Sequence, residues 1–341
     1  MENLAQKIKD RALEMGYEKC GIVKIEDTLD FADKLKKRMF GTKLGFVAYA
    51  DFKGFKDPRK QHPWAKSIIV TVANYGKYNQ PEGFDGMYGK SYTFDGRMNK
   101  DSPEWQMRQD FRAFLEGEGV RCQDEPKFGI VGLRWAAQKA GLGVIRHNTF
   151  FYTDDSGSYC MLEAWLIDKE LEIKESSDLK PCPDSCGLCI KACPTNSLKE
   201  PFKMSLLDCA SFKTTLSPSK GLGNINVKTA SKMGRIVYGC DICQDVCPHN
   251  KGKCAGGEDF PDVDKLVQFM PPEKIMSMSY DEIGKELSKF WYISPGHLWK
   301  WKLNALTFIH NNYNDGHEKY IELGMKDSDK RVRAFAKKIK R

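Results

Sequence analysis

Apolar side chains recur at the spacing of an amphipathic helix along residues 3–16, on a side formed by Leu4, Ile8, Ala12, Leu13 and Met15. Gly16 is a typical stop for that helix. A short strand is predicted over residues 20–25 and a second helix over residues 28–38. The strongest signal is a nearly continuous apolar run at residues 67–74, rich in β-branched side chains, which is typical of a strand buried on both faces.

The pattern changes at residues 75–103, where glycine, tyrosine, asparagine and aspartate dominate. A stretch of this length without regular structure in a compact domain usually forms a binding loop or a lid. Helices are then predicted over residues 104–119 and 132–140, and strands over residues 145–152 and 160–167. Strands that alternate with helices in this way indicate an α+β or α/β core.

Helical patterns return in the last part of the chain, at residues 263–270, 279–290, 301–311 and 331–340. The last two form a pair that resembles one HEAT-like repeat. Because a single repeat cannot bury its apolar face alone, we expect this pair to dock on the part of the chain before it. The expected domains are residues 1–175, 176–258 and 259–341.

An apolar content of 41% and a charged content of 29% are ordinary for a globular protein of 341 residues. No run of about eighteen apolar residues is present, so no membrane span is expected. The N-terminus lacks the features of a secretion signal, which predicts a cytoplasmic protein with reduced thiols. The net charge is +8, with basic clusters at residues 330–333 and 337–341. Charge alone favours a solvated helix face over contact with an anionic partner such as RNA.

The candidate chemistry lies at residues 181–250, which hold eight of the twelve cysteines. Two cysteine runs end in the same way, with Cys193-Pro194 and Cys247-Pro248. In two-cluster bacterial ferredoxins a run of this kind binds a 4Fe–4S cluster, and its last cysteine binds the other cluster. The crossed arrangement predicts a first quartet of Cys182, Cys186, Cys189 and Cys247, and a second quartet of Cys209, Cys240, Cys243 and Cys193.

The spacing departs from the ferredoxin pattern in two places. Three residues rather than two separate Cys182 from Cys186, and Cys209 lies far ahead of Cys240. The alternatives are zinc sites, which favour separated C-x2-C pairs, and a disulfide framework, which suits short secreted chains. Neither calls for the repeated Cys-Pro ending, so we expect two 4Fe–4S clusters. Of the four remaining cysteines, Cys20, Cys122 and Cys160 are expected to be packed as small apolar groups, and Cys254 is assigned no role.

The order of these landmarks resembles one family, the epoxyqueuosine reductases, over nearly the full length. The shared landmarks are Asp57-Pro58-Arg59, Ala73-Asn74-Tyr75, Ala140-Gly141-Leu142-Gly143 with Asn148-Thr149, the double-cluster region with Tyr238-Gly239-Cys240, and the helical pair. The resemblance implies two 4Fe–4S clusters, base-off cobalamin, reduction of an epoxide in a tRNA wobble nucleoside, and a relation to reductive dehalogenases. The fold implied is α+β, with an α/β-like cobalamin-binding core, a ferredoxin-like module and the HEAT-like repeat.

The resemblance also implies an electron path and a cofactor pocket. Electrons from a low-potential donor of the flavodoxin or ferredoxin type enter one cluster and pass to the second and then to cobalt. The segment that resembles the wall of the corrin pocket contains Gly141, Leu142, Gly143, Arg146, His147, Asn148 and Thr149. Glycine lets a backbone approach a ligand closely, so the two glycines are expected to face the cofactor.

Two departures from the family pattern concern the site. The presumed proton donor of the family is an aspartate, and Lys127 stands at its distance from Gly141; an alignment shifted by three residues places Asp124 there instead. The usual Gly-Lys-Asn-Thr is replaced by Arg146-His147-Asn148-Thr149. The substrate therefore stays open between epoxyqueuosine in tRNA and another electrophile, such as an organohalide reduced by a cytoplasmic paralogue. A third interpretation is an electron-transfer protein that serves a corrinoid partner.

Overall fold

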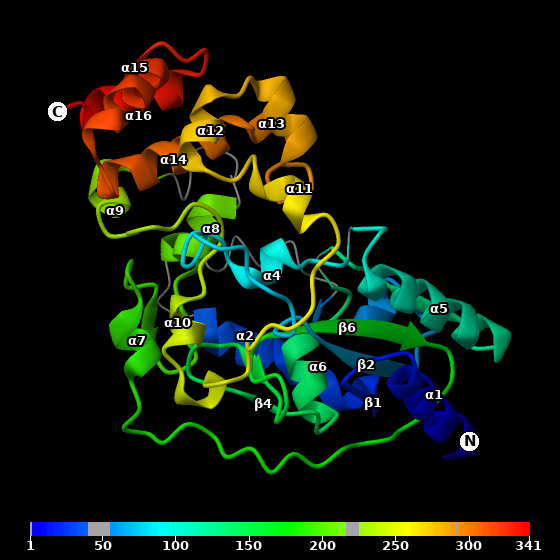
Figure 1. The fold of residues 1–341 in the computed structure, drawn as a ribbon. Helices are drawn as coiled ribbons and strands as arrows, with labels where there is room; N and C mark the ends of the chain where they lie inside the picture. The colour runs from blue at the N-terminus through cyan, green and yellow to red at the C-terminus, as the bar shows by residue number, and fades with distance from the viewer. Residues whose placement is uncertain (1, 40–54, 98, 128, 216–224, 291) are drawn as a thin grey trace.

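A computed structural model describes residues 2–39, 55–97, 99–127, 129–215, 225–290 and 292–341. Its N-terminal part is built on a four-stranded sheet of order β1-β2-β6-β3 (Figure 1). The strands are β1 (Lys19–Lys24), β2 (Ser67–Asn74), β3 (Cys122–Asp124) and β6 (Cys160–Ile167). All neighbouring pairs are antiparallel, and Val70 of β2 lies between Gly21 and Ala164. The antiparallel pairing makes the core α+β and excludes a parallel α/β sheet.

Both faces of this sheet are covered, as the apolar run at residues 67–74 predicted. Ile69 packs with residues of α1 (Glu2–Glu14) and α5 (Pro103–Gly117). Ile68 and Val70 point the other way, onto α6 (Leu133–Lys139). Successive side chains of a strand alternate between faces, so an apolar run without alternation is what a doubly covered strand requires.

The segments around the sheet differ in detail from the prediction. The second helix begins as a 3-10 turn, η1 (Ile25–Thr28), and continues as α2 (Phe31–Met39). The strand expected over residues 145–152 is a hairpin of β4 (Val144–Ile145) and β5 (Phe151–Tyr152). Thr149 has a φ of 69°, in the left-handed region that strands do not use, so the chain turns there. The long loop contains one short helix, α4 (Lys90–Thr93).

The cysteine-rich region consists of short elements joined by turns. They are α7 (Leu188–Ala192), β7 (Leu198–Glu200), β8 (Lys203–Met204), α8 (Ala210–Thr215), α9 (Val227–Ala230) and α10 (Ile242–Asp245). Helices α7 and α10 lie side by side (Figure 1). Each is followed by its Cys-Pro step, and Cys193 and Cys247 both have extended backbone. Proline disfavours helical conformation in the residue before it, which is why both helices end there.

The C-terminal part is helical, as predicted, and contains α11 (Val263–Val267), α12 (Pro272–Ser277), α13 (Tyr280–Glu286), α14 (Trp299–Asn311), α15 (Glu318–Met325) and α16 (Lys330–Ile339). Helices α12 and α15 were not predicted. Every residue of α14 from Trp299 to Ile309 is buried, and Trp301 stacks on Tyr238 with ring centroids 4.8 Å apart. Docking of these helices on the preceding part of the chain is therefore confirmed. No helix of the described residues is long and apolar enough to cross a bilayer.

Candidate active site

All twelve cysteines are free thiols, so the disulfide alternative is wrong. Burial raises the pKa of Cys189 to about 11, and the neighbouring thiols that add to the shift are Cys182, Cys186 and Cys247. Burial also raises the pKa of Cys243, with contributions from the nearby thiols Cys240, Cys209 and Cys193. Such contributions fall with distance, so they identify spatial neighbours. The two sets of neighbours match the two crossed quartets that the spacing predicts.

The second quartet faces a cavity of about 370 Å³. Its four cysteines, Cys193, Cys209, Cys240 and Cys243, are all part of the cavity wall. The opposite wall comes from α6, β6 and the turn between β4 and β5, with Leu133, Met161, Leu162, Phe150 and Phe151. Tyr92 and Arg97 of the long loop complete it, so residues 75–103 contribute to a cavity as expected of a binding loop. The first quartet does not line this cavity.

The turn between β4 and β5 holds most of the residues that were predicted to line a corrin pocket. Arg146, His147 and Asn148 are 1%, 4% and 2% exposed, and each contacts a cysteine-bearing segment. Arg146 Nη1 lies 3.9 Å from Cys182 Sγ, and His147 Nδ1 lies 3.0 Å from the Cys186 carbonyl oxygen. Asn148 Nδ2 donates to the Cys243 carbonyl oxygen at 3.0 Å. Of the predicted set, Thr149 alone is part of the cavity wall.

The two glycines of this segment allow the chain to approach itself rather than a ligand. Gly141 has a φ of 74°, and a Cβ there would lie 1.9 Å from the Glu175 carbonyl oxygen. A Cβ on Gly143 would lie 2.0 Å from the carbonyl oxygen of Tyr152. Leu142 between them is fully buried in the core beside the sheet. The ligand-facing role predicted for the glycines is replaced by this close packing of backbone on backbone.

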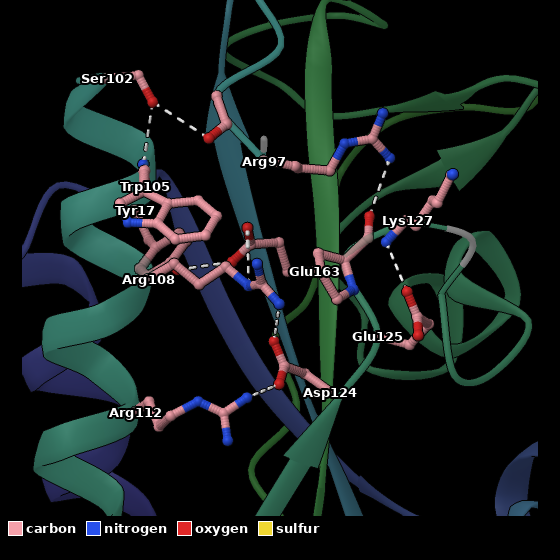
Figure 2. Close-up of polar contacts among 12 residues, drawn as sticks. Tyr17, Arg97, Ser102, Trp105, Arg108, Arg112, Asp124, Glu125, Lys127 and Glu163 are labelled. Carbon is pink, nitrogen blue, oxygen red and sulfur yellow. Dashed lines mark hydrogen bonds and ion pairs between the residues drawn. The ribbon is translucent and has the colours of Figure 1, made fainter. Parts of the chain in front are cut away.

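Neither predicted proton donor lines the cavity. Asp124 lies at the end of β3, buried, and pairs with both Arg108 and Arg112 of α5 (Figure 2). Two guanidinium groups favour the ionised carboxylate, which accepts hydrogen bonds and has no proton to give. Lys127 is exposed on the following loop, and its backbone N–H donates to Glu125 Oε1 at 2.8 Å.

That loop nevertheless reaches the edge of the cavity. Arg97, a wall residue, pairs with Asp95 and donates to the carbonyl oxygen of Pro126 at 3.5 Å (Figure 2). Lys127 is the next residue along the chain. Its backbone is therefore one residue removed from a contact with the cavity wall.

Sequence reasoning missed the place of two residues at the site. Cys160 packs against the core beside the sheet, as expected, and is also part of the cavity wall. Glu163 of β6 is partly buried beside a small void that shares Tyr75, Arg97 and Met161 with the cavity. Burial raises the pKa of Glu163, and the Tyr17 hydroxyl donates to its carboxylate at 2.7 Å. An acidic residue inside the apolar run at residues 160–167 was the available signal for Glu163.

Comparison with known proteins supports the cluster assignment. Residues 182–250 match the family described as a 4Fe-4S double cluster binding domain, which decides against zinc. The chain is 28% identical over 306 residues to the epoxyqueuosine reductase of Cyclobacterium marinum, covering 84% of this chain and 89% of the relative. A crystal structure of selenomethionine-labelled epoxyqueuosine reductase superposes with a TM-score of 0.76 at 22% identity, over 98% of this chain and 88% of that chain. The chain is a relative of the epoxyqueuosine reductases.

A second solved epoxyqueuosine reductase, in complex with a modified tRNA-Tyr stem loop, has the same fold. It superposes with a TM-score of 0.72 at 20% identity, over 99% of this chain and 98% of that chain. The predicted class, an oxidoreductase that resembles the epoxyqueuosine reductases, is confirmed, as is the mixed helix and strand fold.

The surroundings of the first quartet suit an anionic cluster. Arg146 is buried, and its Nε and Nη2 have no hydrogen-bond partner among the described residues. A buried charge without a counter-charge is costly, so a site of this kind requires a negative group beside the guanidinium. A 4Fe–4S cluster held by four thiolates carries a net negative charge, and Cys182 of the first quartet is the nearest predicted ligand.

Proposed function

We propose that this chain is a cobalamin-dependent iron–sulfur reductase that acts on epoxyqueuosine in tRNA. The observation that carries the proposal is the cavity wall, which includes all four cysteines of the second quartet. A redox group in that cavity would lie next to one cluster, while the first quartet stands outside the cavity wall. Electrons would therefore enter at the first quartet, from a flavodoxin or ferredoxin, and leave through the second.

Cobalamin suits the cavity because its wall is mostly apolar and aromatic with few charged groups. Leu133, Phe150 and Tyr92 would hold the cofactor by apolar contacts, and Thr149 would offer it a hydroxyl. When bound, cobalamin would supply reducing chemistry at cobalt that no side chain can provide. The chain's own residues would bind the cofactor, exclude water and supply a proton.

Lys127 is the proposed proton donor. Its place next to Pro126, whose carbonyl oxygen accepts from the wall residue Arg97, supports this role. A small movement of the loop would carry the ammonium group toward the cavity and return it to solvent to regain a proton. Asp124 is the alternative donor, and it would first have to leave its two arginine partners.

The proposed organisation into three domains gives each domain one task. Residues 1–175 would form the cobalamin-binding core, residues 176–258 the ferredoxin-like module, and residues 259–341 the part that contacts tRNA. The contact between helices α14 and α16 supports the proposed HEAT-like pair. A cluster of exposed basic residues lies on and beside α16, at Lys330, Lys337, Lys338, Lys340 and Arg341. Such a surface suits a phosphate backbone.

The test is a single-turnover assay with anaerobically purified protein, added cobalamin, a low-potential reductant and tRNA that carries epoxyqueuosine. Conversion of the epoxide, detected in nucleoside digests by mass spectrometry, is the expected result. Binding of cobalamin without conversion of the tRNA would favour the paralogue that reduces another electrophile. Failure to bind cobalamin would favour the electron-transfer protein.

A further inference from the structure

We propose that Arg146 raises the reduction potential of the cluster held by the first quartet. This inference rests on the electron path of the proposed function and is independent of its substrate. Arg146 is 1% exposed, and its Nη1 lies 3.9 Å from Cys182 Sγ. It differs from the other contacts of its turn, because His147 and Asn148 reach backbone carbonyl oxygens of the cluster segments and Arg146 reaches a sulfur.

Backbone hydrogen bonds of the turn fix the main chain that carries this guanidinium. The Arg146 N–H donates to the Phe150 carbonyl oxygen at 3.0 Å, and the Thr149 N–H donates to the Arg146 carbonyl oxygen at 2.8 Å. The guanidinium carbon lies 5.2 Å from the centre of the Tyr152 ring, which covers one side. Arginine keeps its charge when it is buried, unlike lysine, so the site carries a permanent positive charge.

The other contacts of Arg146 do not neutralise that charge. Among the described residues, Nε and Nη2 of Arg146 have no hydrogen-bond partner. The side-chain contact that remains is the one between Nη1 and the Cys182 sulfur. The counter-charge is therefore the cluster and its thiolates.

The consequence for electron transfer follows from charge. One-electron reduction by the donor adds one negative charge to the cluster and moves no proton. A fixed positive charge at low dielectric stabilises the reduced form more than the oxidised form, which raises the potential. The first cluster would then accept an electron from a weaker donor than it otherwise could. Arg146 thus acts through the first cluster, where electrons enter the protein. It is not part of the cavity wall.

The experiment compares reduction potentials of Arg146→Met, Arg146→Lys and Lys191→Met, measured by redox titration followed by electron paramagnetic resonance, without tRNA or cobalamin. The signal of the first cluster is the one that Cys182→Ala abolishes. Lys191→Met is the matched control, since Lys191 is an exposed cation of α7 between two cluster cysteines. We expect a shift to more negative potential in Arg146→Met and a smaller shift in Arg146→Lys, because the anionic cluster favours the charged ammonium. Lys191→Met should keep a potential close to that of the original protein.

An unchanged potential in Arg146→Met with full iron content would overturn the proposal, as would an equal shift in Lys191→Met. If Arg146→Met loses iron while Arg146→Lys keeps it, the positive charge at position 146 still acts on the first cluster. Loss of iron in both variants would instead assign Arg146 to packing. Because the readout needs no substrate, failure of the tRNA assay leaves this result unaffected.

Discussion

The side-chain amide of Asn148 donates to the carbonyl oxygen of Cys243 at 3.0 Å, and so connects the β4–β5 turn to the second quartet. The adjacent His147 contacts the carbonyl oxygen of Cys186 in the first quartet. One turn of the sheet-bearing part therefore contacts both cluster segments. This bridging explains why the turn is buried although it carries four polar side chains in succession.

The crossed quartets predict the result of removing one cysteine. Cys247→Ala should lose the cluster of Cys182, Cys186 and Cys189. The reason is that Cys247 is among the thiols that raise the pKa of Cys189 and is not among those named for Cys243. Iron content in anaerobic protein should fall from about eight to about four atoms per chain. Cys193→Ala is the matched variant and should remove the second cluster instead. Retention of the first cluster in Cys247→Ala would contradict crossed ligation.

Much of this arrangement could be predicted from sequence. The parts that could not be predicted share one physical reason. The buried strand β2, the cysteine quartets and the docked C-terminal helices follow from local pattern and spacing. The role of Gly141 does not, because it depends on Glu175, which is far along the chain. The burial of Asp124 depends in the same way on Arg108 and Arg112 of a helix. These roles depend on contacts between distant segments, which a local sequence pattern cannot predict.

The basic surface of α16 predicts salt-dependent tRNA binding. Removing the C-terminal helices is a poor test, because α14 is buried in the core they share with the cluster region. Lys337→Gln with Lys338→Gln removes two exposed charges instead. Affinity for tRNA should fall, and the slope of log affinity against log salt should decrease by about one for each phosphate that a lysine no longer neutralises. Lys36→Gln with Lys37→Gln, on α2, is the control of equal charge and should bind as the original protein does.

Lys300 predicts a pH dependence of stability. It is 1% exposed on α14, and burial, with a contribution from Lys213, lowers its pKa to about 7. In the unfolded chain a lysine holds its proton up to about pH 10.4. Between pH 7 and pH 10 the unfolded state therefore binds more protons, so the stability of the folded state rises with pH. Below pH 7 both states are protonated and the dependence disappears.

The gain from this group between pH 7 and pH 9 should be on the order of 1–3 kcal/mol in the free energy of unfolding. Anaerobic urea unfolding at pH 7, 8 and 9 measures it. Lys300→Met should lose this part of the pH dependence, and Lys338→Met, which changes an exposed lysine, should keep it. Equal slopes in the original protein and in Lys300→Met would show that Lys300 does not titrate in this range.

The two candidate proton donors give opposite expectations. Lys127→Met should abolish turnover and leave iron content, cobalamin binding and stability unchanged, because Lys127 is exposed and only its loop contacts the cavity wall. Asp124→Asn should chiefly destabilise the fold, by roughly 3–5 kcal/mol, since it leaves Arg108 buried beside a neutral group. Turnover at saturating cofactor and the free energy of unfolding separate the two effects. Full activity in Lys127→Met with a folded but inactive Asp124→Asn would transfer the role to Asp124. If both variants are active, Tyr92, whose hydroxyl lies 2.7 Å from Ser211 Oγ in the cavity wall, is the next residue to change.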